Sequence, residues 1–385
     1  MQSSLRSQLP SCRQLVLGLL MGIVLFSFQR ASCQTAPVTG RPVKVAVVGL
    51  VHDHIAGFLP QLPRHHDVEL VGIVETNSAL IAKYERNFHL DPRLIFSSID
   101  AMITQQHPDA ILVYTSIADH RKVIEAAARN GVNVMVEKPL ATNLADAIAI
   151  RRTAREHHIQ VLVNYETTWY ASNREAFEQL HHGRLGDVRR VVIHDGHKGP
   201  KEIGVSPEFL KWLTDPQQNG AGALFDFGCY GADLMTWLMG GHAPLSVTAI
   251  TQTDKPEVYP HVDDEATVIL KYPKAQAVIQ ASWNWPFDRK DMEVYGATGY
   301  AMTVGPDRMR LRFAGEAQES QSAAPPLASP QDNSLDYLVA VLRGQVNPNG
   351  SLTGLDTNLV VMQILDAARE SARTGKTIQL TPLPE

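Results

Sequence analysis

The sequence predicts an α/β protein of two domains: a doubly wound parallel sheet, then an α+β domain with a large, mainly antiparallel open sheet. Three observations predict it. The chain has 385 residues, more than one hydrophobic core usually holds. Short apolar strands alternate with helical segments through residues 43–163, which is typical of strand–helix–strand units with right-handed crossovers. In residues 164–385 the loops lengthen and the strands alternate apolar and polar residues, as in antiparallel sheets.

Residues 1–33 are interpreted as an export signal. Arg6 and Arg13 precede an apolar stretch at 15–28, and small residues then lead to Cys33. This is the layout of a cleaved signal peptide, so we expect a periplasmic or secreted protein. An uncleaved anchor and a misassigned start are the alternatives. Cys33 could carry a lipid, although the residues before it match a lipid-attachment motif poorly.

Composition excludes several classes of protein. Residues 34–42 are typical of a flexible linker, and no later apolar run is long enough for a membrane span. The formal net charge is −5, so no basic excess supports nucleic-acid binding. Only Cys229 lies beyond the export signal, which leaves no partner for an intramolecular disulfide.

The first domain, residues 43–163, is expected to contain six strands. Most are near-continuous apolar runs, as expected where helices cover both faces of a sheet. The strands are predicted at Val43–Val48, Glu69–Val74, Leu94–Phe96, Ala110–Tyr114, Val132–Val136 and Gln160–Val163. Helices are predicted to begin near His54 and to span residues 77–87, 121–129 and 143–157.

The strand at 132–136 runs directly into Glu137-Lys138-Pro139. Ligands of an open α/β sheet bind at the carboxyl ends of its strands. Proline restricts the residue before it and can hold a sharp turn. The pattern therefore places the Lys138 amine on a rigid mount facing a ligand. A solvated lysine in a surface turn is the alternative.

The turns after the first two strands indicate a dinucleotide site. Gly49 ends the first strand, and Glu75 ends the second, 26 residues later. An acidic side chain there can bind ribose hydroxyls and repel a 2′-phosphate, so NAD is favoured over NADP. A solvated glutamate is the alternative.

The glycine loop departs from the usual pattern. G-x-G-x-x-G would need glycine where Val51 and His54 stand. The amino terminus of the following helix still offers N–H groups to an anion. His52, Asp53 and His54 invite a metal interpretation, but three consecutive residues rarely converge on one ion, so no metal is expected.

The second domain, residues 164–385, carries a further candidate element. Its strands are predicted at 188–194, 245–251, 266–272 and 277–283, and a late helix at 359–374 is expected to return toward the first domain. A helix at 224–239 would place Asp226 and Tyr230 on one face, since they are four residues apart. A capping aspartate with a core tyrosine is the alternative.

These motifs together resemble the Gfo/Idh/MocA oxidoreductases, the family of glucose–fructose oxidoreductase and inositol dehydrogenase. The resemblance covers about residues 43–380 and rests on Glu137-Lys138-Pro139-Leu140, Thr115 to His120, Asp226 with Tyr230, and Asp264-Glu265-Ala266-Thr267. It implies a Rossmann domain, a C-terminal domain whose open sheet forms homo-oligomers, and a sugar or cyclitol substrate.

The resemblance also implies roles for single residues. Lys138 matches the catalytic lysine and Asp226 the aspartate that orients the substrate. Tyr230 stands where histidine is usual, as in the glucose–fructose oxidoreductase branch. The residues expected to bind the cofactor are Gly49, Val51, His52, His54, Glu75, Thr115, His120, Glu137 and Lys138. The candidates for sugar contacts are Asn164, Trp169, His194, His197, Lys198 and Trp285, although tryptophans are also core residues.

Oxidation of an alcohol needs a proton acceptor. A nearby ammonium lowers the pKa of a tyrosine, and a cationic nicotinamide lowers that of a lysine. Our hypothesis is that Tyr230 accepts the proton, Lys138 tunes it and binds the hydroxyl, and Asp226 orients the substrate.

Three functions remain open at this point. The first is an NAD(P)-dependent sugar or cyclitol oxidoreductase. The second is an NAD-using glycoside hydrolase that works by oxidation, elimination, addition and reduction. The third is a binding protein that has lost its cofactor. Because an exported enzyme meets little free NAD, a tightly held cofactor that is reduced and reoxidised within one turnover suits either enzyme.

Overall fold

The structure is a computed structural model that describes residues 38–383. The expected export signal, with Cys33, and residues 34–37 of the linker lie outside the described residues. Within the described part of the chain, no helix has both the length and the apolar character that a membrane span requires.

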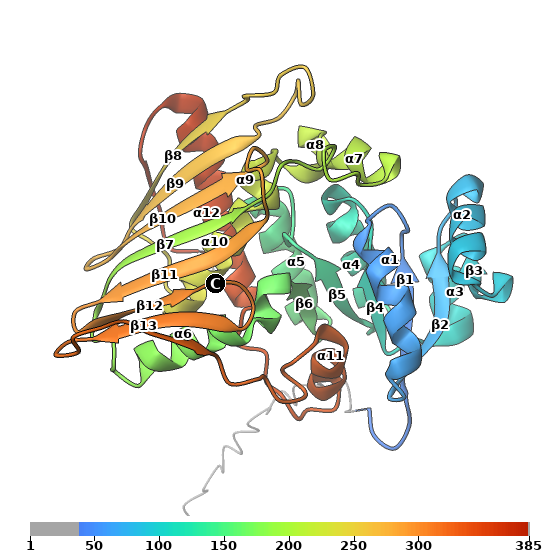
Figure 1. Ribbon diagram of the computed structural model, residues 1–385. Helices are drawn as coiled ribbons and strands as arrows, with labels where there is room; N and C mark the ends of the chain where they lie inside the picture. Colours follow the sequence, from blue (N-terminus) through green and yellow to red (C-terminus); the bar gives the residue numbers. More distant parts are fainter. Residues whose placement is uncertain (1–37, 384–385) are drawn as a thin grey trace, which may run out of the picture. The chain divides into compact units, whose positions relative to one another are not determined.

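The first sheet is parallel and has the strand order β3-β2-β1-β4-β5-β6 (Figure 1). The order reverses between β1 and β4, so a crevice for ligands is expected at the carboxyl ends of these strands. The strands are β1 (Val43–Val48), β2 (Val68–Val74), β3 (Ile95–Phe96), β4 (Ala110–Val113), β5 (Asn133–Glu137) and β6 (Val161–Asn164). The helices are α1 (His54–Phe58), α2 (Ser78–Phe88), α3 (Ile99–Gln106), α4 (His120–Ala128) and α5 (Leu144–Glu156), with 3₁₀ turns at Leu59–Arg64, Pro92–Leu94 and Ile117–Asp119.

The second sheet has nine strands in the order β14-β13-β12-β11-β7-β10-β9-β8-β15. Its pairs are antiparallel except for β7 with β10, which confirms the predicted fold class. The strands are β7 (Val188–Gly196), β8 (Ser246–Gln252), β9 (Glu265–Lys271), β10 (Gln276–Ser282), β11 (Arg289–Gly296), β12 (Gly299–Thr303), β13 (Arg308–Phe313), β14 (Ser320–Ala323) and β15 (Ile378–Gln379).

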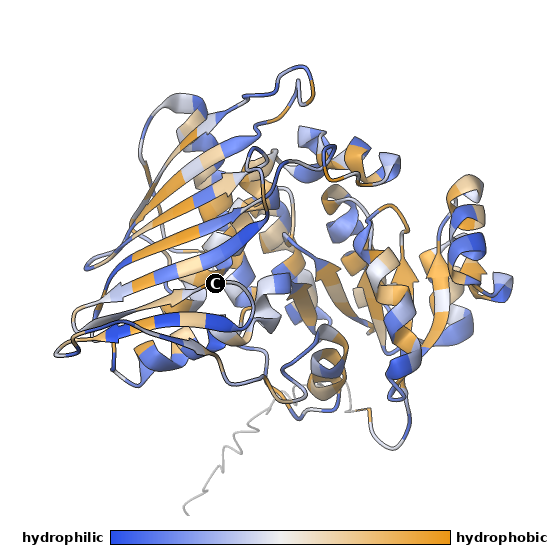
Figure 2. Cartoon of the chain, viewed as in Figure 1, coloured by the Kyte–Doolittle hydropathy of each residue, from blue (hydrophilic) through white to orange (hydrophobic). Residues whose placement is uncertain are grey.

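Helices α10 and α12 cover one face of the second sheet (Figure 1). Hydrophobic residues recur along its strands (Figure 2), and the buried ones belong to one cluster with apolar residues of these two helices. The helices of this part are α6 (Ala171–His181), α7 (Pro207–Leu213), α8 (Pro216–Asn219), α9 (Ala223–Asp226), α10 (Gly228–Leu238), α11 (Ser334–Leu342) and α12 (Leu355–Thr374), with a 3₁₀ turn at Glu166–Trp169.

The end of the chain returns to the first sheet. Leu335, Leu338 and Leu342 of α11 belong to the same apolar cluster as Val45 and Leu112 of the parallel strands. Helix α12 contacts α5, where the Leu144 N–H donates to an Asp366 carboxylate oxygen at 2.7 Å. The C-terminal helices therefore tie the two sheets into one unit.

One predicted helix is wrong. The expected continuous helix at 224–239 is broken at Phe227 into α9 and α10. The Asp226 carbonyl accepts a hydrogen bond from Lys138 Nζ at 2.8 Å, and the Tyr230 N–H donates instead to the Phe227 carbonyl at 3.1 Å. A side chain from the first domain thus competes for a carbonyl that a continuous helix would use.

Candidate active site

Lys138 and Asp226 form a buried ion pair between the two domains. Lys138 Nζ contacts the Asp226 carboxylate and, at 2.8 Å, its carbonyl oxygen. Burial alone would lower the pKa of Lys138, but the Asp226 carboxylate outweighs burial and leaves that pKa raised. The lysine predicted at the strand end therefore points into the domain interface as an ammonium group.

Asp226 is fixed on both sides. Its second carboxylate oxygen accepts from Trp283 Nε1 at 3.0 Å. The helix that carries it begins at Gly222, where an added Cβ would lie 1.8 Å from the Asp263 carbonyl oxygen. The Asp263 carboxylate accepts from the N–H groups of Gly222 and Leu224 at 2.9 and 2.7 Å. The close approach that glycine allows, together with this cap, sets the direction of Asp226.

Two ammonium groups lie close to the ring of Tyr230, but the pKa of its hydroxyl is not lowered as predicted. Lys138 Nζ lies 5.1 Å and Lys290 Nζ 4.9 Å from the centre of its ring. Burial raises the pKa of Tyr230 well above its usual value. The predicted lowering of this pKa is therefore wrong, because both ammonium groups meet the ring, and each is paired with a carboxylate.

The turn after β1 supplies a cradle for a dinucleotide. Gly49 has φ +87°, and an added Cβ would lie 2.7 Å from Thr115 Cγ2, so only glycine lets the turn approach β4 this closely. Glu75 ends β2, and its carboxylate accepts from the Leu50 N–H at 3.0 Å. The residues for a ribose and an adjacent phosphate thus stand at the crevice, and they fit the predicted cofactor.

His52 of the loop is a buried residue that packs against the second domain. His52 is 1 % exposed and packs against the rings of Phe209 and Trp212, at 4.7 and 5.3 Å between ring centres. Its Nδ1 accepts from the His54 N–H at 3.3 Å. Burial lowers the pKa of His52 well below its usual value, so the ring is neutral.

Glu137 connects the loop to β6. Its carboxylate pairs with His54 Nδ1 at 2.8 Å and accepts from Asn164 Nδ2 at 2.9 Å, and Trp169 Nε1 donates to Asn164 at 3.1 Å. Burial alone would raise the pKa of Glu137, but these partners hold it below its usual range. Nitrogen and oxygen atoms of His52, His54 and Glu137 lie within 4.8 Å of one another, and the contact between His54 Nδ1 and the Glu137 carboxylate brings two of them together. Asn164 and Trp169 thus belong to this chain of hydrogen bonds.

His120 supports the loop that carries Lys138. The ring is fully buried, and its Nδ1 lies 3.2 Å from the Leu140 carbonyl oxygen. Burial lowers the pKa of His120 to about 4, so the ring is neutral and Nδ1 donates. Its Nε2 is buried and has no partner among the residues at 38–383, which leaves an acceptor free beside the crevice.

A segment of the second domain covers the nucleotide loop. Trp212 Nε1 donates to the Val51 carbonyl at 3.2 Å, and the Ser206 N–H donates to Asp53 at 2.7 Å. The Ser116 hydroxyl donates to Gln218 at 2.8 Å. We call residues 206–218 the strap.

The remaining sugar candidates separate into two groups. His197 faces the site, since its ring lies 4.8 Å from that of Phe227, and burial lowers its pKa. Its Nδ1 accepts from the Gly199 N–H at 2.9 Å, which leaves Nε2 as a donor. His194 alternates to the other face of the sheet and pairs with Asp291 at 3.0 Å.

Lys198 and Trp285 lie at the margin of the site. The Lys198 side chain is exposed, and its carbonyl accepts from Lys255 Nζ at 2.8 Å. Trp285 packs beside Gly196, and its N–H donates to the His197 carbonyl at 3.2 Å. Neither side chain contacts Lys138 or Asp226 in the described structure.

Sequence reasoning missed two charged groups near Tyr230, Lys290 and Glu166. Lys290 of β11 pairs with Glu166, which precedes α6, and Asp195 of β7 is the register partner of Lys290. The charged run around Lys290 gave no strand pattern, so β11 was not predicted.

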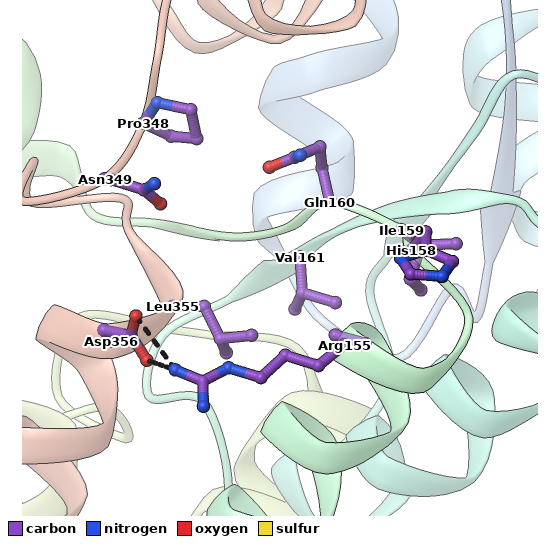
Figure 3. Close-up of a pocket in the computed structure, with 10 residues that line it drawn as sticks. Arg155, His158, Ile159, Gln160, Val161, Pro348, Asn349, Leu355 and Asp356 are labelled. Atoms are coloured by element: carbon purple, nitrogen blue, oxygen red, sulfur yellow. Dashed lines mark hydrogen bonds and ion pairs between the residues drawn. The ribbon is translucent and has the colours of Figure 1, made fainter. Parts of the chain in front are cut away.

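A separate pocket of about 240 Å³ lies at the amino end of β6 (Figure 3). Its wall includes Arg155 of α5, which bonds to Asp356 at 3.2 Å. Ligands of parallel sheets bind at the opposite, carboxyl ends of the strands. This pocket therefore belongs to the far edge from Lys138.

Two family models match the chain. Residues 43–165 match the oxidoreductase family with an NAD-binding Rossmann fold, and residues 173–302 match the GFO/IDH/MocA C-terminal domain.

Similar proteins carry related descriptions. A trans-1,2-dihydrobenzene-1,2-diol dehydrogenase of Xenopus tropicalis is 29% identical over 46% of this chain and 50% of its own, so the match spans half of that relative. A D-apiose dehydrogenase of Paraburkholderia graminis is 22% identical over 82% of this chain and 84% of its own. The structure of an aldose–aldose oxidoreductase from Caulobacter crescentus superposes with a TM-score of 0.75 at 23% identity, over 88% of this chain and all of that one. At this identity the superposition shows a shared fold.

Proposed function

The chain belongs to the Gfo/Idh/MocA oxidoreductase family, and on that basis we propose that it oxidises a hydroxyl group of a sugar or cyclitol by hydride transfer. The observation that carries the proposal is the buried Lys138–Asp226 pair at the carboxyl edge of β5. Removing an ion pair from water costs free energy of folding. Buried ionisable groups at such an edge are therefore candidates for a functional role.

In the proposed mechanism Lys138 handles the proton. NAD, when bound, supplies the hydride acceptor. Lys138 Nζ binds the substrate oxygen and, in its neutral form, takes the hydroxyl proton. Asp226 holds Nζ in place, and Trp283 holds Asp226. Lys138 replaces Tyr230 as the proton acceptor. Burial raises the pKa of Tyr230, whereas the positive charge of a bound nicotinamide would lower the pKa of Lys138.

The test is Lys138→Met. The variant is expected to lose turnover by at least about 10³-fold, since it removes the group that moves the proton. Lys122→Met, at an exposed lysine of α4, is the matched control and is expected to keep wild-type turnover. Unchanged turnover in Lys138→Met with correct folding by circular dichroism would sink the proposal.

The preferred cofactor is proposed to be NAD. Glu75 accepts from the Thr76 and Asn77 N–H groups at 2.8 and 2.9 Å as well as from Leu50, so its charge is held at the end of β2. A fixed negative charge there repels a 2′-phosphate. Glu75→Gln should therefore narrow the difference in Kd between NAD and NADP, measured by titration calorimetry.

A redox-neutral form of the reaction has one supporting observation, the strap over the nucleotide loop. A cover of this kind favours a cofactor that stays bound between turnovers. The structural relative from Caulobacter crescentus is described as an aldose–aldose oxidoreductase. Exchange of a hydride between two sugars in this protein would regenerate the cofactor within one turnover. Incubating the protein with pairs of sugars and no added NAD tests this form.

The two other functions give different results. A glycoside hydrolase of this fold would release nitrophenol from aryl glycosides, whereas the proposed enzyme leaves them intact. A binding protein without cofactor would carry no NAD after purification. Mass spectrometry of the denatured protein detects the dinucleotide directly.

Self-association is proposed through the uncovered face of the second sheet. Ile250 on β8 is 67% exposed and Ile269 on β9 is 45% exposed. Exposed apolar side chains on a broad sheet are typical of an interface. Light scattering should show a dimer or larger species, and Ile250→Lys should shift it toward the monomer.

Export is proposed from the sequence of residues 1–33. Cleavage near Cys33 would leave Rossmann and C-terminal domains intact. Expression of the full chain in a bacterial host, followed by fractionation and sequencing of the mature amino terminus, tests it. An uncleaved cytoplasmic product would contradict the proposal.

A further inference from the structure

Asp195 is a buried carboxyl group without a partner. It follows Val191 and Ile193 on the face of β7 that packs toward α10, and it is 1 % exposed. Neither of its carboxylate oxygens has a hydrogen bond with any residue that the structure describes. A buried acceptor left in this state destabilises the fold, so its retention calls for a reason.

The position of Asp195 links it to the active site. Its register partner on β11 is Lys290, which lies 4.9 Å from the ring centre of Tyr230. The charges of Lys290 and Lys138 both act on Asp195. The ammonium group of Lys290, however, is bound by Glu166. Asp195 therefore lies beside the reacting groups, and no protein group occupies its oxygens.

A comparison with Asp233 shows how the surroundings of Asp195 differ from those of an ordinary buried carboxyl group. Asp233 of α10 is fully buried and also lacks a hydrogen-bond partner within residues 38–383. Burial is the only cause that shifts its pKa, whereas Asp195 is surrounded by charged groups of the site. Asp233 is thus a core residue, whereas Asp195 lies among the charged groups around Lys290 and Lys138.

We propose that Asp195 binds a second hydroxyl group of the substrate, next to the hydroxyl group that Lys138 deprotonates. This deepens the proposed function and rests on it. A carboxyl group accepts a hydrogen bond from one hydroxyl and, when protonated, donates one to another. The substrate is therefore a compound with vicinal hydroxyl groups.

The charges of the site also select a neutral compound. Lys138 is paired with Asp226 and Lys290 with Glu166, so neither ammonium group in the described site is free for an anion. Burial raises the pKa of Asp195 well above its usual value, so its carboxyl group brings no positive charge to an anion either. A neutral sugar or cyclitol fits this lining, whereas a uronic acid or a sugar phosphate would bring an unmatched negative charge.

The experiment measures binding by titration calorimetry with the NAD-loaded full chain. The panel contains D-glucose, D-xylose, D-apiose, myo-inositol, D-glucuronate and glucose 6-phosphate, followed by the single-deoxy analogues of the best binder. Asp195→Leu is expected to lose about 10- to 100-fold in Kd for the best neutral compound. One deoxy analogue lacks the hydroxyl group that Asp195 binds. Asp195→Leu should bind that analogue as well as the wild type does, because the hydrogen bond is missing in both complexes.

Two controls separate a ligand contact from a structural role. Asp195→Asn keeps a donor and an acceptor and should retain most of the affinity, and Asp233→Leu should leave binding unchanged. The inference is overturned if the anionic compounds bind best or if nothing on the panel binds. It is also overturned if Asp195→Leu weakens the Kd of every deoxy analogue by the same factor. Because calorimetry needs no turnover, binding that depends on Asp195 without any oxidation would refute the proposed function alone.

Discussion

The chemistry of Lys138 is set by contacts from the other half of the chain. The strand end and the proline could be read from the sequence, and they gave the position of the amine correctly. Its state could not be read, because Asp226 lies 88 residues away and its carbonyl and carboxylate both bind Nζ. The result is an ammonium group whose pKa is raised despite burial.

The Asp226 carboxylate should therefore control the pH dependence of oxidation. The neutral form of Lys138 accepts the proton, so kcat/KM for oxidation rises with pH through the pKa of that amine. Asp226 raises this pKa, and burial, which remains in Asp226→Asn, lowers it. The variant should move the rise by about one or more pH units toward acid, with a lower plateau. A pH profile of kcat/KM checks this, and a shift toward alkaline pH would contradict it.

Tyr230→Phe should be mild compared with Lys138→Met. Burial raises the pKa of Tyr230, so its hydroxyl keeps its proton near neutrality. We expect kcat to fall by less than about 10-fold, since the aromatic ring that packs under Lys138 is retained. Steady-state kinetics of both variants on one substrate give the comparison. Equal losses in the two variants would return the role of proton acceptor to Tyr230.

Among the helices and strands, the sequence predicts those whose position depends on a local pattern of apolar residues. The six strands of the first sheet lie within one or two residues of their predicted ends, because most of them are apolar runs that the fold buries on both faces. Helix 224–239 was predicted as one piece because its apolar pattern continues through Phe227. The break arises from a long-range hydrogen bond to Lys138, which no window of the sequence contains.

The same reasoning explains the elements that were missed. Strand β11 begins with Arg289, Lys290 and Asp291, whose charges suggest a loop until their partners on β7 are known. Asp195 directly follows the strand predicted at 188–194, and only the structure shows that β7 continues through it and that its side chain is buried. No element was predicted for the strap, because its contacts with residues 51–53 come from a distant part of the chain.

Helix α10 should make stability depend on pH through Asp233. Burial raises the pKa of Asp233 well above its usual value. Its contribution to stability is thus complete below the unfolded pKa, near pH 4, and declines as the pH rises toward the folded pKa. Asp233→Asn does not ionise, so it should gain about 2 kcal/mol relative to the wild type between pH 4.5 and 8. Urea unfolding at both pH values measures this, and a constant difference would contradict it.

For the whole molecule, the two sheets act as one unit because two helices near the C-terminus pack against the first domain. Helix α12 packs on α5, and α11 joins the core of the parallel sheet. The strap then crosses the nucleotide loop from the other side. A dinucleotide in the crevice would be enclosed by both halves, so its release requires the strap to move.

Trp212→Ala should accelerate cofactor release. The indole of Trp212 packs on His52 and donates to the Val51 carbonyl, so its removal takes both a ring contact and a hydrogen bond from the closed strap. We expect NADH to dissociate about 10-fold faster or more, as measured by stopped-flow loss of its fluorescence on dilution with excess NAD. Glu208→Gln is the matched control within the strap. It removes only the partly exposed pair with Lys83, at 3.1 Å, and such pairs contribute little. If Trp212→Ala released NADH at the wild-type rate, the strap would not retain the cofactor, and the redox-neutral form of the reaction would lose its structural support.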